Sequence, residues 1–397
     1  MKYLVLVPDG AADEPLEALG GKTPLEAAHT PNLDRLAREG VGGLVQIIPP
    51  ARPAGSDIGN LEIFGYDTRN HYTGRAPLEA ASMGLPVGPD DLAFRCNTIT
   101  RDGDILVDYS AGHISTPEAR ELIKTLQSQL GREGLRFYPG VGYRHIVVWR
   151  GGPEGLKSFP PHDIMGQSIK AHLPAGPRQE EVRQLMDAAG PLLEQAPVNQ
   201  RRRDQDKNQA NAIWLWGEGR GLQLPGLKEK YGLRGGVISA VDLVRGIGRS
   251  AGLEVIAVPG ITGYVDTNYL GKAQYALEAL KRLDMVYVHV EAPDEASHNG
   301  DPAAKVQAIE DFDRQVVGTI LAGLGSLGPC RILVSPDHPT PIRLRTHSRE
   351  PVPFLLWGEG FAADGMEAYG EQAAGAGSLR LDHGHQMMDL LTGKKAL

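Results

Sequence analysis

The chain has 397 residues, of which 41 are basic and 49 acidic, so its formal net charge is −8. At about 150 residues per domain, this length predicts two or three domains with a large buried core and excludes a disulfide-dependent miniprotein. The negative charge disfavours nucleic acid and acidic membranes as partners, and two cysteines, Cys96 and Cys330, cannot build a disulfide framework or a four-cysteine metal site.

The N-terminal segment alternates between apolar strands and helices. Residues 3–7 are apolar but too few for a signal segment or a membrane span, so we expect a buried strand in a cytoplasmic protein. Thr30 and Pro31 open a helix that ends at Gly40. Residues 44–48 form the next strand, and Ser56 is expected to cap the helix after it.

Similar units recur in the second half of the chain. Strands are expected at residues 212–216, 237–240, 255–258, 285–290, 331–334 and 354–357, with a long helix at 302–323. Strands that alternate with helices predict an α/β fold with a mainly parallel, doubly wound sheet. Ligands bind beyond the carboxyl ends of strands in such sheets, so polar residues that follow strands are informative.

The middle of the chain has a different pattern of predicted elements. It offers strands at 105–109 and 145–149 and helices at 116–130 and 178–189, separated by loops. We expect residues 91–209 to form a smaller inserted α/β domain. Residues 1–90 and 210–397 would then form the core domain.

Residues typical of metal ligands follow several of the predicted strands. They are Asp9, Asp294, His298, Asp337, His338 and His347. Asp294 and His298 are four residues apart, so on a helix both would face one ion. The adjacent Asp337 and His338 would diverge in an extended loop and suit two neighbouring ions better than one. Mixed carboxylate and imidazole ligands suit Mn²⁺, Zn²⁺ or Mg²⁺.

Ser56 has two interpretations. As an ordinary helix N-cap it would be structural. A serine at a helix N-terminus also lies beside backbone N–H groups that stabilise anions, and contact with a metal ion would make it a nucleophile. One residue can do both.

The order of these motifs resembles that of the alkaline phosphatase superfamily and, more narrowly, of the 2,3-bisphosphoglycerate-independent phosphoglycerate mutases of the archaeal type. The resemblance runs over essentially the whole chain. It is carried by Pro8-Asp9-Gly10, Gly55-Ser56-Asp57, Thr73-Gly74-Arg75-Ala76-Pro77, Asp108-Tyr109-Ser110-Ala111-Gly112-His113, Pro293-Asp294-x-x-x-His298 and Pro336-Asp337-His338.

This resemblance implies an alkaline phosphatase-like core that holds two divalent ions, with Mn²⁺ expected ahead of Mg²⁺, Co²⁺ or Zn²⁺, and that uses no 2,3-bisphosphoglycerate. It implies one ion on Asp294, His298 and His347, and another on Asp9, Ser56, Asp337 and His338. Ser56 would accept a phosphoryl group and return it, interconverting 2- and 3-phosphoglycerate in glycolysis and gluconeogenesis. His113, Arg144 and Lys272 are similar in context to the family's substrate contacts, and a closing inserted domain would retain the glycerate.

Other functions stay open at this point. A metal-dependent phosphatase or a phosphopentomutase-like sugar phosphate mutase would need the same seven ligands. A small-molecule kinase is disfavoured because no Gly-x-x-x-x-Gly-Lys-[Ser/Thr] motif is present. A non-catalytic metal-binding protein would have no need for Ser56 among the ligands. The partner is expected to be a small molecule, and assembly into a homo-oligomer is left open.

Overall fold

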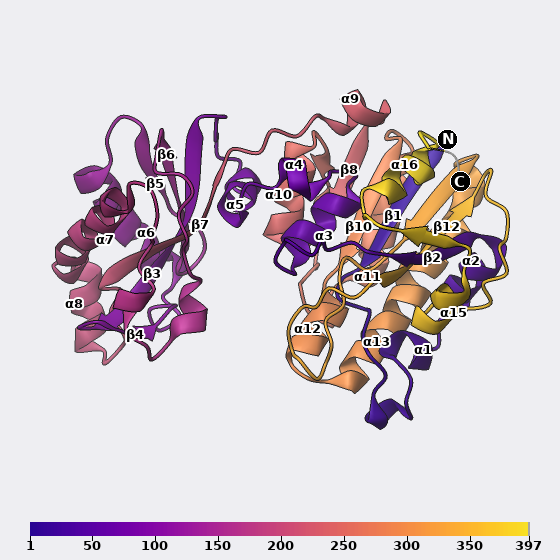
Figure 1. Ribbon diagram of the computed structural model, residues 1–397, viewed down its shortest axis with the longest axis horizontal. Helices are drawn as coiled ribbons and strands as arrows, with labels where there is room; N and C mark the ends of the chain where they lie inside the picture. Colours follow the sequence, from indigo (N-terminus) through magenta and orange to yellow (C-terminus); the bar gives the residue numbers. More distant parts are fainter. Residues whose placement is uncertain (396–397) are drawn as a thin grey trace. The chain divides into compact units, whose positions relative to one another are not determined.

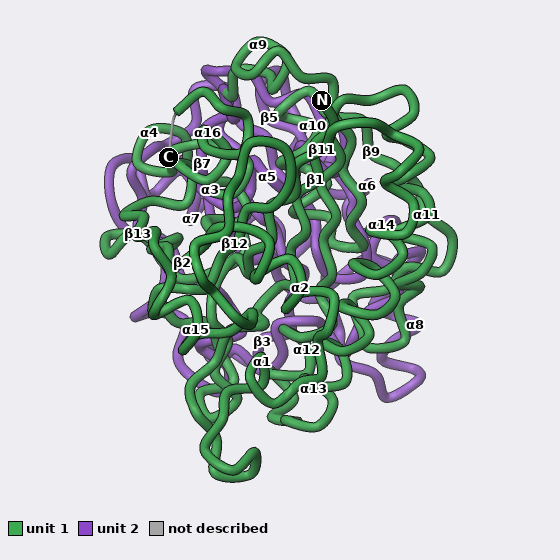
Figure 2. Tube along the Cα trace, turned by 90° about the vertical axis from the view of Figure 1, so that its right-hand side faces the viewer, with its two compact units in different colours: residues 1–72, 224–397 green, residues 73–223 purple. Residues whose placement is uncertain are grey.

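The computed structural model describes residues 1–395, which divide into two compact units (Figure 1). Unit 1 comprises residues 1–72 and those from 224 onward, and unit 2 comprises residues 73–223 (Figure 2). Unit 2 extends beyond the expected range 91–209 at both ends. The reason is that helix α5 (Arg75–Ser82) packs on strands β3 (Asp91–Asp102) and β7 (Ala212–Arg220), which pair with each other.

Unit 1 is built on an eight-stranded, mostly parallel sheet, which confirms the predicted fold class. The strand order is β13-β2-β12-β11-β1-β10-β8-β9. The strands are β1 (Lys2–Pro8), β2 (Val41–Val45), β8 (Gly235–Ile238), β9 (Glu254–Val255), β10 (Met285–Val290), β11 (Cys330–Val334), β12 (Val352–Gly358) and β13 (Leu379–Leu381). β1 lies between β10 and β11 and is parallel to both, whereas β12 is antiparallel to its two neighbours.

Of the strands predicted for unit 1, β2 and β9 differ most from the sequence prediction. β2 covers Val41–Val45 instead of residues 44–48, because Gly42 and Gly43 allow the neighbouring backbones to approach closely. A Cβ on Gly43 would collide with the carbonyl group of Leu379. β9 is limited to Glu254–Val255, since only this dipeptide pairs with β8.

Helices flank the sheet of unit 1. They are α1 (Pro24–Ala27), α2 (Pro31–Glu39), α3 (Ser56–Ile63), α4 (Thr68–His71), α9 (Leu227–Tyr231), α10 (Asp242–Ser250), α11 (Tyr269–Leu280), α12 (Ala292–His298), α13 (Pro302–Asp311), α14 (Gly318–Gly323), α15 (Glu371–Ala376) and α16 (Gln386–Thr392). The helix predicted at 302–323 is present as α13 and α14 joined by a π-helical segment, Phe312–Val317. Short 3₁₀ helices occur at Glu17–Leu19, Pro161–Ile164, Ile169–Ala171 and Leu324–Ser326.

Unit 2 contains an antiparallel five-stranded sheet. Besides β3 and β7 it comprises β4 (Ile105–Asp108), β5 (Leu135–Tyr138) and β6 (Arg144–Arg150). Three further helices belong to this unit, α6 (Thr116–Leu130), α7 (Gln179–Glu194) and α8 (Pro197–Asp204). Leu122 and Leu126 of α6 and Leu185 of α7 pack with Trp214 and Trp216 into one core, so the two tryptophans are structural as their alternation with apolar residues indicated.

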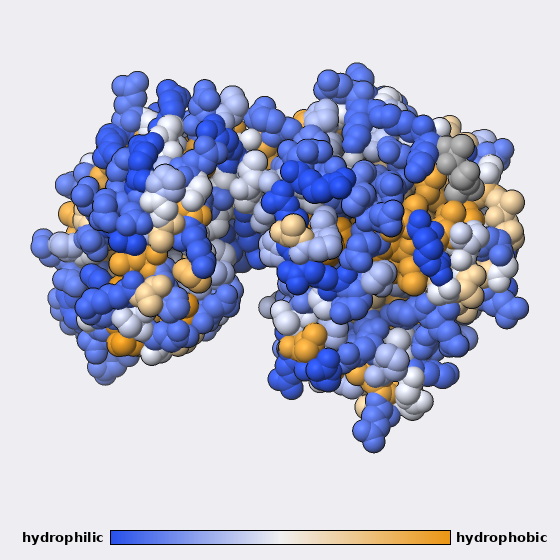
Figure 3. Space-filling view, viewed as in Figure 1, coloured by the Kyte–Doolittle hydropathy of each residue, from blue (hydrophilic) through white to orange (hydrophobic). Residues whose placement is uncertain are grey.

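Hydrophilic side chains predominate on the face seen in Figure 3, and apolar residues show between them in smaller groups. Within residues 1–395, no helix combines the length and the apolar character that crossing a membrane requires.

Candidate metal centre

The topology of the sheet gathers the predicted ligands at one edge of unit 1. Asp9 follows β1, α12 begins two residues after β10 ends, and Asp337 lies just beyond β11. Because β1 is parallel to both β10 and β11, the carboxyl ends of all three strands meet at the same edge. Segments that are far apart in the sequence are thereby brought into contact.

The first group consists of Asp294, His298 and His347, whose ligand atoms all lie within 4.8 Å of one another. Asp294 Oδ2 is 3.1 Å from His298 Nε2, as expected for positions four apart on α12, and Asp294 Oδ1 is 3.7 Å from His347 Nε2. The two Nε2 atoms are 3.1 Å apart. His298 Nδ1 is 2.9 Å from the carbonyl oxygen of Arg345, to which it donates, so in the neutral imidazole the lone pair is on Nε2, where it can face a cation.

The second group lies beside it and includes Ser56. Ser56 Oγ is 3.0 Å from His338 Nε2. The same nitrogen is 3.5 Å from Asp9 Oδ1 and 3.5 Å from Asp337 Oδ2. The expectation that Asp337 and His338 diverge is therefore wrong. The loop after β11 bends, so both side chains are buried and face the same space.

Ser56 is not the N-cap that the sequence predicted. Gly55 occupies that position, and Ser56 is the first residue of α3. Its hydroxyl group faces His338 instead of an N–H group of its own helix. Asn60, one turn later, donates from Nδ2 to the carbonyl oxygen of Ser56 and to Asp337 Oδ2, at 3.0 and 2.7 Å, and so ties the start of α3 to the second group.

Four residues of this centre were missed by sequence reasoning. They are Asn60, His289, Glu291 and Thr340. His289 is fully buried in β10, and its Nε2 is 2.9 Å from Asp9 Oδ2. For His289 the available signal was a polar residue within the apolar run Met285–Val290, and for Glu291 it was a carboxylate directly after that strand. The Asn60 and Thr340 contacts depend on loop geometry that no spacing rule conveys.

Buried polar atoms without hydrogen-bond partners show that the donor set fits cations. Among residues 1–395, both carboxylate oxygens of Asp9, Nε2 of His289 and Oε2 of Glu291 make no hydrogen bond of acceptable geometry, although His289 Nε2 and Asp9 Oδ2 lie 2.9 Å apart. Burial and neighbouring carboxylates raise the pKa of Asp9 well above its usual value and that of Glu291 to about 8. Buried carboxylates of like charge need a nearby positive charge, and this mixture of oxygen and imidazole ligands suits divalent ions.

The expected substrate contacts lie in both units. Lys272, on α11 of unit 1, is fully buried and donates from Nζ to the carbonyl oxygen of His289 at 2.8 Å. Burial lowers the pKa of Lys272 to about 8, and Glu291 and Asp9 oppose this shift, so its ammonium group lies in the field of these two carboxylates. In unit 2, His113 lies in the loop after β4 and has a positive φ of 49°, and Arg144 is an exposed residue at the start of β6.

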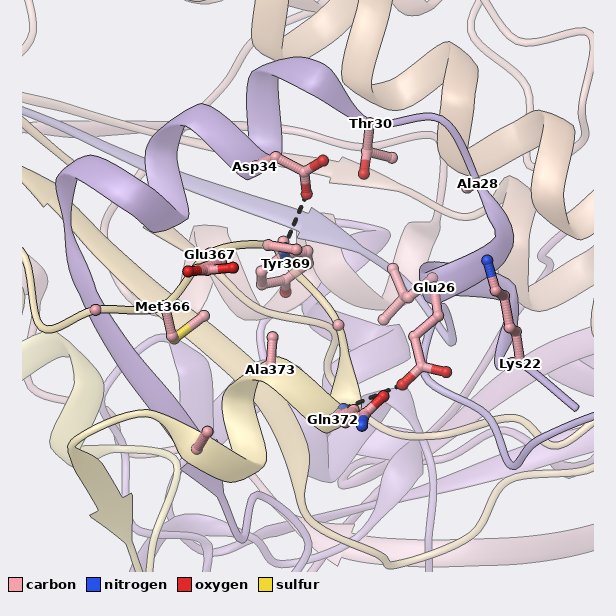
Figure 4. Close-up of a pocket in the computed structure, with 15 residues that line it drawn as sticks. Lys22, Glu26, Ala28, Thr30, Asp34, Met366, Glu367, Tyr369, Gln372 and Ala373 are labelled. Atoms are coloured by element: carbon pink, nitrogen blue, oxygen red, sulfur yellow. Dashed lines mark hydrogen bonds between the residues drawn. The ribbon is translucent and has the colours of Figure 1, made fainter.

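A surface pocket of about 560 Å³ in unit 1 is separate from the expected ligands. Its lining includes Lys22 and Met366, and hydrogen bonds from Tyr369 to Asp34 and from Gln372 to Glu26 join its walls (Figure 4). None of the lining residues is an expected metal ligand or substrate contact.

Comparisons with known proteins give one consistent result. Residues 37–199 match the family model described as 2,3-bisphosphoglycerate-independent phosphoglycerate mutase. A probable 2,3-bisphosphoglycerate-independent phosphoglycerate mutase of Geobacter sulfurreducens is 53% identical over 98% of this chain and 99% of its own length. The mutase of Methanothrix thermoacetophila is 50% identical over the same shares of the two chains. Among solved structures, a Pyrococcus horikoshii protein is 32% identical with a TM-score of 0.83, covering 100% of this chain and 98% of that one. The cofactor-independent phosphoglycerate mutase of Thermoplasma acidophilum is 27% identical with a TM-score of 0.72, covering 100% of both chains.

Proposed function

Because this chain belongs to the family of 2,3-bisphosphoglycerate-independent phosphoglycerate mutases, we propose that it interconverts 2- and 3-phosphoglycerate through a phosphoserine at Ser56. The observation that carries this mechanism is the position of Ser56 Oγ, 3.0 Å from His338 Nε2 and beside two groups of metal-type ligands. A phosphatase or a sugar phosphate mutase is not favoured, since the relatives share the phosphoglycerate mutase name over nearly their full length.

We propose that each of the two groups holds one divalent ion. Asp294, His298 and His347 would hold one divalent ion, and Asp9, Ser56, Asp337 and His338 the other, with Mn²⁺ as the proposed metal. Such ions would lower the pKa of the Ser56 hydroxyl group and offset the charge of the transferring phosphoryl group. Ser56 would attack phosphorus, release one glycerate hydroxyl group, and later return the phosphoryl group to the other hydroxyl group.

The three substrate contacts remain proposals. Lys272 would supply positive charge near the transferring group, and Arg144 would hold a carboxylate or phosphate with its planar guanidinium group. His113 would donate a hydrogen bond to the substrate. Interconversion at this step would place the enzyme in glycolysis and gluconeogenesis, in the cytoplasm.

Incubation with 3-phosphoglycerate tests the proposal. We expect 2-phosphoglycerate to form, detected by coupling to enolase, with little release of inorganic phosphate. Addition of 2,3-bisphosphoglycerate should leave the rate unchanged. Stoichiometric phosphate release without 2-phosphoglycerate would instead identify a phosphatase, and an absolute requirement for ATP would identify a kinase.

Removal of divalent ions is expected to abolish activity and to lower thermal stability. Bound ions stabilise the folded state, by about 2.7 kcal/mol when their concentration is a hundred times the dissociation constant. Dialysis against EDTA followed by addition of Mn²⁺ should therefore restore both the rate and the unfolding temperature. Full activity after exhaustive dialysis, with metal analysis showing none bound, would contradict the proposal.

Binding of the ion at the first group is expected to strengthen as the pH rises. The hydrogen bond to Asp294 raises the pKa of His298 to about 9, so the metal-free protein keeps a proton there at pH 7. An ion must displace that proton, so affinity should rise by up to about tenfold per pH unit between pH 7 and 9. Calorimetry in buffers of different ionisation enthalpy measures the released proton. His29→Gln, at an exposed histidine, is the control, and an affinity independent of pH would refute this expectation.

A further inference from the structure

Thr340 lies between the two groups of ligands and contacts one member of each. Its Oγ1 is 2.5 Å from Asp294 Oδ1, which belongs to the first group. The same oxygen is 3.1 Å from Nδ1 of His338, which belongs to the second. Thr340 is fully buried, so water does not compete for these hydrogen bonds.

The direction of both hydrogen bonds follows from the number of protons available. An ionised carboxylate only accepts, so the single hydroxyl proton of Thr340 goes to Asp294. The threonine oxygen is then an acceptor toward His338, and Nδ1 of His338 must carry the proton. This tautomer leaves the lone pair on Nε2, the atom that faces Ser56 Oγ at 3.0 Å.

Hydrogen bonds to both backbone polar groups of Thr340 hold the residue in place. Its N–H donates to the carbonyl oxygen of Ala12 at 3.1 Å, and its own carbonyl oxygen accepts from Lys305 Nζ at 3.1 Å. The buried ammonium group of Lys305 also pairs with Asp13 at 2.8 Å. Gly10 leaves room for the contact, because a Cβ there would lie 2.5 Å from Asp294 Oδ1 and 2.6 Å from Thr340 Oγ1.

His298 and His338 are therefore oriented in different ways. His298 donates from Nδ1 to a backbone carbonyl group, that of Arg345, which no side-chain substitution removes. His338 depends on a side chain that it shares with the ligand Asp294. One oxygen atom, Thr340 Oγ1, therefore links Asp294 of the first group to the imidazole of the second group.

We propose that Thr340 is a positioning residue that couples the two ion sites, by fixing the tautomer of His338 while it holds Asp294. The inference rests on the proposed function only in taking these residues as metal ligands. It predicts that binding of one ion changes the affinity for the other, and that the effect depends on the hydroxyl group of Thr340. Orientation of a ligand by an outer hydrogen bond typically changes metal affinity by about 10- to 100-fold.

Calorimetric titration of the metal-free chain with Mn²⁺ tests the inference. In Thr340→Val, which keeps the shape and removes the hydroxyl group, we expect one of the two affinities to fall by about 10- to 100-fold. Thr340→Ser keeps the hydroxyl group and should stay within about threefold of the wild type. Thr98→Val is the matched control, since it removes a buried threonine hydroxyl group that has no hydrogen-bond partner among residues 1–395. Two unchanged affinities in Thr340→Val, or equal losses in the Val and Ser variants, would overturn the proposal.

The tautomer gives a second test that does not need the Val variant to fold. In ¹⁵N-histidine NMR of the Zn²⁺-loaded wild type, His338 should carry its proton on Nδ1, assigned by its loss in His338→Gln. A proton on Nε2 would overturn the proposal. Neither measurement uses turnover, so normal ion coupling in a chain that does not convert 3-phosphoglycerate would refute the proposed function alone.

Discussion

Ser56→Ala is expected to lower kcat for the conversion of 3-phosphoglycerate by at least about a thousandfold, because it removes the atom that accepts the phosphoryl group. Among the described residues, the hydroxyl group that contacts His338 Nε2 is that of Ser56. The folded state should change little, since Gly55, and not Ser56, is the N-cap of α3.

Two measurements separate the chemical role of Ser56 from a structural one. Mass spectrometry of the wild-type chain, quenched during turnover, should find a phosphoryl group on the peptide that contains Ser56. Ser326→Ala, at an exposed serine, should retain full activity and controls for the substitution itself. Appreciable activity in Ser56→Ala would remove the phosphoserine from the mechanism.

The convergence of the candidate ligands was predictable because it follows from periodicity and topology. Apolar strands that alternate with helices predict a parallel sheet, and a parallel sheet places Asp9, Asp294 and Asp337 at one edge. The spacing of Asp294 and His298 on a helix also predicted their shared orientation, which the 3.1 Å contact confirms. These inferences need only the regular geometry of strands and helices.

The parts that could not be predicted depend on irregular backbone. Asp337 and His338 converge because the loop after β11 bends, and the hydrogen bonds of Thr340 arise from the same loop. The predicted strand began three residues later than β2 does, because glycine generally disfavours strands. Here, close packing against β12 and β13 requires glycine. The long strand β3 was missed, since Arg95 and Asn97 interrupt its apolar pattern while both are buried.

Asp294→Asn is expected to release the first ion and to lower kcat by at least about a hundredfold, while the second group keeps its own ligands. Asp294 contacts both histidines of the first group, and an amide has neither the charge nor the second acceptor oxygen that these contacts use. Metal analysis of the dialysed variant should show one fewer ion per chain than the wild type.

Glu295→Gln is the control that makes this result decisive. Glu295 is the next residue of α12 and lies in the field of Asp294 and His298, yet among residues 1–395 its carboxylate does not cluster with the candidate ligands. The two substitutions remove the same charge from nearly the same place.

If Asp294→Asn lost metal and activity only because the negative charge of α12 is reduced, both variants would be impaired alike. If Asp294 acts as a ligand, Glu295→Gln should keep two ions and stay within about twofold of wild-type activity, because a charge outside the ligand set contributes little in partly solvated surroundings. Equal loss of metal in both variants would mean that the two groups attract ions only through their summed charge.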